Sequence, residues 1–93
     1  MKEETRGIIE REIDRLAFGY KNEEIEAIQE TTPIENTEEF LLGHTLGYLR
    51  RFGEFVVLMQ EGKLTKTDDK TITRILLTRL PEIRKKLMRH LNK

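Results

Sequence analysis

Hydrophobic residues along this chain recur at the three- and four-residue spacings of an α-helix. Nowhere do apolar and polar residues alternate for more than a few positions, as they would in a half-buried strand. A first helix is predicted over residues 3–18, ending near Gly19, because one apolar stripe has helical spacing there: Ile9, Ile13, Leu16, Ala17 and Tyr20. The pattern therefore predicts an all-α fold.

A short second helix is predicted after Asn22, which is a favourable N-cap residue. It offers only Ile25 and Ile28 to a core, so we expect it to be marginal or to merge with the first helix. Pro33 ends it, because the residue before a proline is displaced from helical backbone angles.

A third, central helix is predicted over residues 36–60. Asn36 is expected at the N-cap with Glu39 three residues later, and Gly62 fits the left-handed position after the last turn. Its apolar arc covers well over half of the circumference: Phe40, Leu41, Leu42, Leu46, Tyr48, Leu49, Phe52, Phe55, Val56, Val57, Leu58 and Met59. A helix that is apolar on most sides must be covered on most sides. We therefore expect a dimer or larger oligomer to complete the fold.

Glycines within the central helix point in the same direction. Each costs about 1 kcal/mol relative to alanine in a helix interior, so a close approach by another helix is expected to compensate. The predicted interface between copies consists of Gly43, Leu46, Gly47, Leu49, Phe52, Gly53 and Val56.

The last helical stretch is predicted to open at Thr67, with Asp68 and Asp69 in its first turn. Its apolar residues continue on one face to the end of the chain: Ile72, Ile75, Leu76, Leu80, Ile83, Leu87 and Leu91. Pro81 either kinks one long helix or sits at the first position of a new one. Together these elements predict a single helical domain over residues 1–93, a small three- to four-helix bundle with a central apolar helix.

The composition excludes several classes of protein. With no cysteine among its 93 residues, the chain has no disulfide scaffold, no thiolate zinc site and no cysteine nucleophile. The longest apolar run is five residues, which excludes a membrane span, and the charged N-terminus does not resemble a signal peptide. We expect a soluble, cytoplasmic protein. Abundant Glu, Lys, Arg, Ile and Leu, with few Asn and Gln, resemble thermophile composition.

The net charge of zero hides two opposite halves. Residues 1–39 have twelve acidic and five basic side chains, and residues 40–93 have the reverse, so the halves carry −7 and +7. We expect acidic side chains to pack against basic ones within the chain or between neighbouring chains.

A basic face near the C-terminus is a candidate contact for nucleic-acid phosphates: Arg74, Arg84, Lys85 and Arg89. The alternative is a solvated outer face, because residues 65–93 contain no aromatic side chain to stack on bases.

A candidate pocket lies on the central helix, where His44, Tyr48 and Arg51 share one edge of the apolar arc with Phe55. An imidazole, a phenol and a guanidinium that converge suit an anion or acid–base chemistry. The alternative is that the rings border the core with their polar tips in water. In that case Arg51 pairs with an acidic residue of the first two helices.

Two short patterns resemble helical hydrolases. Arg84 and His90, six residues apart, resemble the Arg-x(4–6)-His motif of HEPN ribonucleases, although Lys85 follows where that family often has Asn, Asp or His. The resemblance implies RNA cleavage by an Arg and a His across a dimer. Glu23-x-x-Glu26 is similar to half of the Mg²⁺-binding carboxylate set of MazG-type pyrophosphohydrolases, whose second half would need more than Glu54. The alternative is a solvated acidic face: Glu23, Glu24, Glu26, Glu30, Glu38 and Glu39.

The leading hypothesis is a non-enzymatic interaction module that self-associates through its central helix and uses its charged faces for a protein partner. Nucleic-acid binding through the basic C-terminal helix is the first alternative. A HEPN-like or MazG-like hydrolase is the second. No cofactor, metal ion or membrane is expected to take part.

Overall fold

The structure, a computed structural model, describes residues 1–16, 23, 26–27, 30 and 37–92. These residues form four α-helices and no strand: α1 (Glu3–Asp14), α3 (Thr37–Glu61), α4 (Lys66–Thr78) and α5 (Leu80–Leu91). The all-α prediction is therefore confirmed for this part of the chain. None of the described helices is both long enough and apolar enough to span a bilayer.

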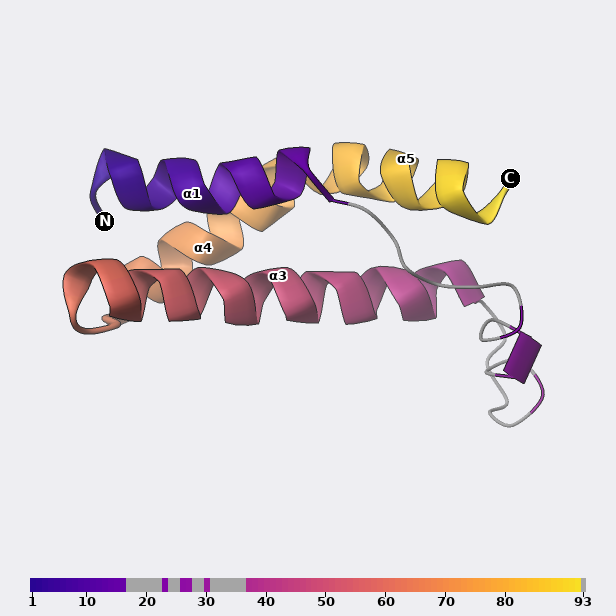
Figure 1. Ribbon diagram of the computed structural model, residues 1–93, viewed down its shortest axis with the longest axis horizontal. Coiled ribbons are helices and arrows are strands. Elements are labelled where there is room, and N and C mark those ends of the chain that lie inside the picture. The colour runs from indigo at the N-terminus through magenta and orange to yellow at the C-terminus, as the bar shows by residue number, and fades with distance from the viewer. Residues whose placement is uncertain (17–22, 24–25, 28–29, 31–36, 93) are drawn as a thin grey trace.

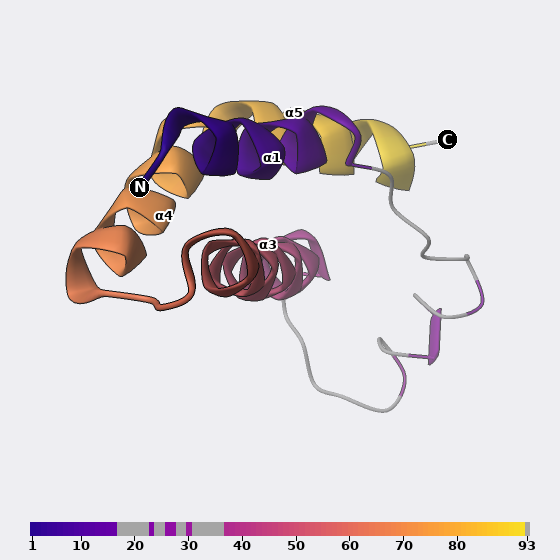
Figure 2. The same cartoon turned by 60° about the vertical axis from the view of Figure 1, so that its left-hand side comes forward.

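Helix α3 is the central element and packs against α1, α4 and α5. It runs antiparallel to α1, while α4 crosses it and α5 continues in line with α1 (Figure 1). Viewed nearly along the axis of α3, the other three helices lie above it and to one side (Figure 2). This arrangement leaves one long face of α3 without a covering helix from α1, α4 or α5.

The core lies between α3 and the other three helices. The side chains that form it are buried and apolar: Ile9, Ile13, Leu41, Leu42, Leu49, Val56, Val57, Ile72, Ile75, Leu76, Ile83 and Leu87. The stripe predicted for the first helix is confirmed at Ile9 and Ile13, with Leu16 packed against the core. However, α1 ends at Asp14, before its predicted end, while Ala17 and Tyr20 lie outside the described residues.

The C-terminal end of α3 agrees with the sequence. Gly62 follows the last helical residue, Glu61, with a φ of 81°, and its N–H donates to the Leu58 carbonyl at 3.0 Å. This is the left-handed position that glycine adopts without steric cost. The predicted N-cap, Asn36, lies outside the described residues, and α3 begins at Thr37.

The start of α4 corrects the sequence prediction, because the N-cap is Thr65 and not Thr67. The Thr65 hydroxyl accepts from the Asp68 N–H at 3.1 Å, and the Asp68 carboxylate accepts from the Thr65 N–H at 3.1 Å and from its hydroxyl at 2.9 Å. This reciprocal capping box satisfies two backbone donors at the helix start. These hydrogen bonds, the backbone one above all, hold the pKa of Asp68 below its ordinary value.

We expect Thr65→Ala to lower the free energy of unfolding by about 1 kcal/mol, since it removes the N-cap hydroxyl. Thr67→Ala is the matched control and should be neutral or slightly stabilising, because alanine is the better helix former. Because the pKa of Asp68 is depressed in the folded chain, the stabilisation that its carboxylate provides is present above pH 3.8 and is lost on further acidification. The difference in unfolding free energy between Thr65→Ala and the native chain should therefore shrink at acidic pH. Urea unfolding at neutral and acidic pH measures both effects. Equal losses for the two variants would contradict the assignment of the cap.

Pro81 separates two helices. Helix α4 ends at Thr78, Arg79 has φ −98° and ψ 7°, and α5 begins at Leu80 with Pro81 in its first turn. Proline is tolerated there because the N–H that it lacks would have no partner within the helix. Of the two alternatives from the sequence, the structure has the second, a new helix.

Candidate interaction surface on the central helix

Helix α3 is divided lengthwise into a buried side and an exposed side. The buried side consists of Leu41, Leu42, Thr45, Leu49, Gly53, Val56 and Val57. Opposite them, five large hydrophobic side chains are 43–69% exposed: Phe40, Tyr48, Phe55, Leu58 and Met59. With the exposed His44 and Arg51, they form what we call the outer face of α3. An exposed apolar patch on a small domain is a candidate site for binding another surface.

The residues predicted from sequence to form an interface are split between the two sides. Leu49, Gly53 and Val56 are buried in the core of the chain itself, and Leu46 and Phe52 are half-buried against that core. Gly43 and Gly47 are exposed. No other residue of the predicted interface, which consists of Gly43, Leu46, Gly47, Leu49, Phe52, Gly53 and Val56, is in the exposed class.

The glycines of α3 also differ in their surroundings. A Cβ atom placed on Gly53 would lie 3.1 Å from Cγ2 of Ile72. At Gly43 and Gly47 such an atom would meet nothing within 4 Å. Within the described chain, the close helix approach that the glycines predict therefore occurs at Gly53, where α4 crosses α3.

The candidate pocket residues His44, Tyr48 and Arg51 all lie on the outer face of α3. The Tyr48 hydroxyl donates to Oε1 of Glu12 at 2.8 Å, and this hydrogen bond, together with burial, raises the pKa of Tyr48. The Tyr48 ring also stacks on Phe52, with ring centroids 6.4 Å apart. It is thus Tyr48 that contacts an acidic residue of α1.

Two neighbouring arginines of α3 have different environments. Arg50 forms two hydrogen bonds to the carboxylate of Asp69, at 3.0 and 2.9 Å, and lies 3.4 Å from Glu54. Arg51 is exposed and forms no hydrogen bond or ion pair within the described residues. The sequence-based alternative, in which Arg51 pairs with an acid of the first two helices, is not present among these residues.

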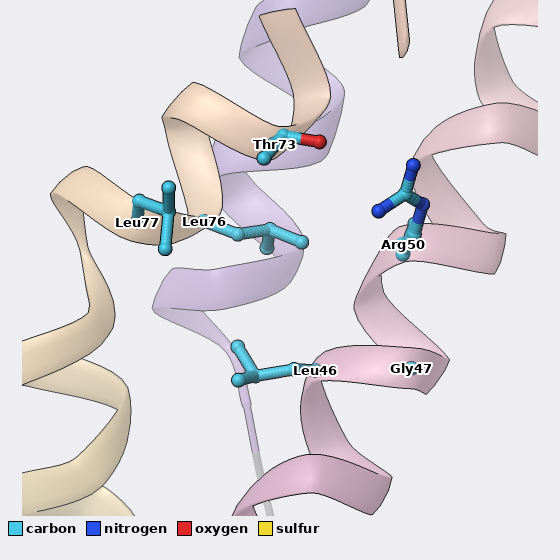
Figure 3. Close-up of a pocket in the computed structure, with 6 residues that line it drawn as sticks. All are labelled: Leu46, Gly47, Arg50, Thr73, Leu76 and Leu77. Atoms are coloured by element: carbon cyan, nitrogen blue, oxygen red, sulfur yellow. The ribbon is translucent and has the colours of Figure 1, made fainter. Parts of the chain in front are cut away.

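A cavity of about 270 Å³ lies between α3 and α4, away from the three predicted pocket residues (Figure 3). The side chains of Leu46 and Leu76 extend into it from the two helices. Arg50 lines it as well, but its guanidinium is already bound to Asp69. Gly47, Thr73 and Leu77 complete the lining, and none of the three predicted pocket residues contributes.

The basic residues proposed for nucleic-acid contact are all exposed. Arg84 pairs with Glu39 at the start of α3, which raises the pKa of Arg84. Arg74, Lys85 and Arg89 form no ion pair within the described residues.

Two further basic residues, Arg79 and Lys86, bind the end of α1 and lie outside the set proposed for phosphate contact. Arg79 pairs with Asp14 and donates to the Glu10 carbonyl at 2.9 Å, and Lys86 donates to the carbonyls of Ile13 at 2.9 Å and Asp14 at 3.0 Å. The carbonyls of Ile13 and Asp14 belong to the last turn of α1, where carbonyls have no i+4 donor within the helix and attract cations. The hydrogen bond from Arg79 holds the pKa of Asp14 below its ordinary value. The expected contact between acidic and basic halves is therefore present within the chain.

The residues of the two hydrolase-like patterns differ in their surroundings. Arg84 is bound to Glu39, and His90 is half-buried near the end of α5. Glu23 and Glu26 are exposed, Glu24 lies outside the described residues, and Glu54 is bound to Arg50. No group of three or more His, Cys, Asp or Glu side chains in the described ranges is arranged to hold a metal ion.

Comparisons with protein-family models, with curated proteins and with solved structures found no match to this chain.

Proposed function

We propose that this chain is a small, non-enzymatic helical module that self-associates through the outer face of α3. One observation carries the proposal: five large hydrophobic side chains on one helix remain 43–69% exposed, on the side opposite the core. Full burial of one such side chain contributes roughly 1.5–3 kcal/mol. The outer face therefore supplies a driving force for association that a single copy does not use.

The patch also differs from the rest of the surface in its continuity. Phe40 and Met59 lie 19 residues apart on α3, so the outer face extends over roughly 28 Å at 1.5 Å per residue. A patch of this length on a straight helix suits a second helix laid along it. Elsewhere among the described residues, the large exposed hydrophobic side chain is Leu77, which is 62% exposed, belongs to α4 and lines the cavity between α3 and α4.

The test measures mass in solution. Light scattering at tens of micromolar should give at least twice the 11.0 kDa of one chain. Phe55→Glu and Met59→Glu should each shift the mass towards one chain, because a carboxylate buried in the interface would be desolvated without a partner. Leu77→Glu is the matched control, since it makes the same change on an exposed hydrophobic residue outside the outer face.

A native chain that stays at 11.0 kDa at this concentration contradicts the proposal. Dissociation by Leu77→Glu with no effect of Phe55→Glu also contradicts it, because association would then involve the groove between α3 and α4. Circular dichroism of each variant should show unchanged helicity, since all three substituted positions are exposed.

A further inference from the structure

Six of the seven residues of the outer face, all except Leu58, have a symmetric order along α3. Six exposed side chains follow one another at spacings of four, four, three, four and four: Phe40, His44, Tyr48, Arg51, Phe55 and Met59. The midpoint of this series lies between Leu49 and Arg50. Turning the series end to end therefore places each position on another member of the same series.

An antiparallel pair of such faces brings three unlike pairs together. About a two-fold axis through the midpoint, Phe40 lies opposite the partner's Met59, His44 opposite the partner's Phe55, and Tyr48 opposite the partner's Arg51. Thioethers and cations both pack favourably on aromatic rings. In a two-fold interface each of these contacts is made twice.

The charges on the outer face distinguish antiparallel from parallel packing. A parallel pair in register places Arg51 against the partner's Arg51, and like charges in contact are unfavourable. An antiparallel pair places it instead beside Tyr48, whose hydroxyl is bound to the carboxylate of Glu12. Arg51 has no ion pair within the described chain, so this carboxylate at the border of the outer face is a complementary site for it.

Building on the proposed self-association, we infer that the partner is a second copy of this chain whose α3 packs antiparallel, with the two-fold axis between Leu49 and Arg50. The partner's Arg51 then lies on the Tyr48 ring and pairs with Glu12. Glu12 and Arg51 thereby determine which orientation forms, while the apolar residues of the outer face supply most of the affinity.

A charge-exchange experiment tests this pairing. Glu12→Lys and Arg51→Glu should each weaken the dimer about tenfold or more, because each places two like-charge pairs in the interface. An equimolar mixture of the two variants, and the double variant E12K/R51E, should recover to within a few-fold of the native Kd, because opposite charges then meet again. Glu3→Lys and Arg74→Glu are the matched controls, with the same charge changes away from the outer face.

Distances between spin labels test the orientation separately, and the absence of cysteine in the chain makes single labelling simple. At 1.5 Å per residue, labels on Gly47→Cys should lie within about 20 Å of each other and labels on Lys63→Cys beyond about 35 Å. A parallel dimer would give short distances at both positions.

The outcomes separate this inference from the proposed function. Dimers with short distances at both positions, or without recovery in the charge exchange, overturn the antiparallel arrangement and leave self-association standing. A monomeric native chain overturns both. Restored binding together with one short and one long distance supports the antiparallel dimer.

Discussion

Leu49→Glu is expected to unfold the chain. Leu49 is 1% exposed at the centre of α3, within the core formed by all four described helices. A carboxylate at this position would be buried without a partner, which costs several kcal/mol. Since the whole stability of a small domain is about 5–15 kcal/mol, this loss is comparable to the total. Circular dichroism at 222 nm should show loss of helicity at room temperature.

Phe55→Glu is the control for this experiment, because it makes a similar change on the same helix at a residue that is 61% exposed. It should keep its helicity and a cooperative thermal transition, and change only the mass in solution. A folded Leu49→Glu variant with an unchanged melting temperature would contradict the placement of Leu49 in the core. The two variants thus distinguish residues that hold the fold together from residues available to a partner.

Which side of α3 faces the core is the main point that the sequence left open. Periodicity gives the angles of the side chains relative to one another. It does not give the direction of the core when the apolar arc exceeds half of the circumference. The sequence has hydrophobic residues on both sides of this helix, with Leu49 and Val56 on one side and Phe55 and Met59 on the other. The contacts with α1, α4 and α5 decide which of them are buried. For this reason the predicted interface residues include three that are buried within the chain itself: Leu49, Gly53 and Val56.

Local signals were more informative where they involve backbone geometry. The glycine at the end of α3 was predicted correctly, because few other residues adopt a positive φ. The cap of α4 was misplaced by two residues, although Thr65 with Asp68 three positions later has the spacing of a capping box and Thr67 does not.

Contacts between segments that are distant in the sequence decide the structure around Pro81. Pro81 fits both a kinked helix and the first turn of a new one, so the sequence around it allows either. In the structure, the neighbouring Arg79 is held at the break by Asp14 and the Glu10 carbonyl, more than 60 residues away. The charge of each half predicted that such contacts form, but not which side chains form them.

A second large effect is expected at Gly53 of α3, which lies against the Ile72 side chain of α4. A Cβ atom on this residue would already lie 3.1 Å from Cγ2 of Ile72 and 3.4 Å from its Cγ1 and Cδ1. The Ile72 side chain is fully buried, so it has little room to move away. Gly53→Leu adds three further carbon atoms to that Cβ, and we expect it to lower the free energy of unfolding by about 1–3 kcal/mol through overpacking.

Gly47→Leu is the matched control on the same helix, because a Cβ atom there meets nothing within 4 Å. Leucine favours the helix over glycine by up to about 1 kcal/mol, so Gly47→Leu should have a larger free energy of unfolding than the chain with glycine at this position. Both substitutions are best compared by urea unfolding in the Phe55→Glu background, where self-association does not contribute to the measured stability. Opposite signs for the two leucines would show that Gly53 is required by packing inside the chain. A destabilised Gly47→Leu variant in this background would instead mean that another part of the same chain lies against the exposed glycines.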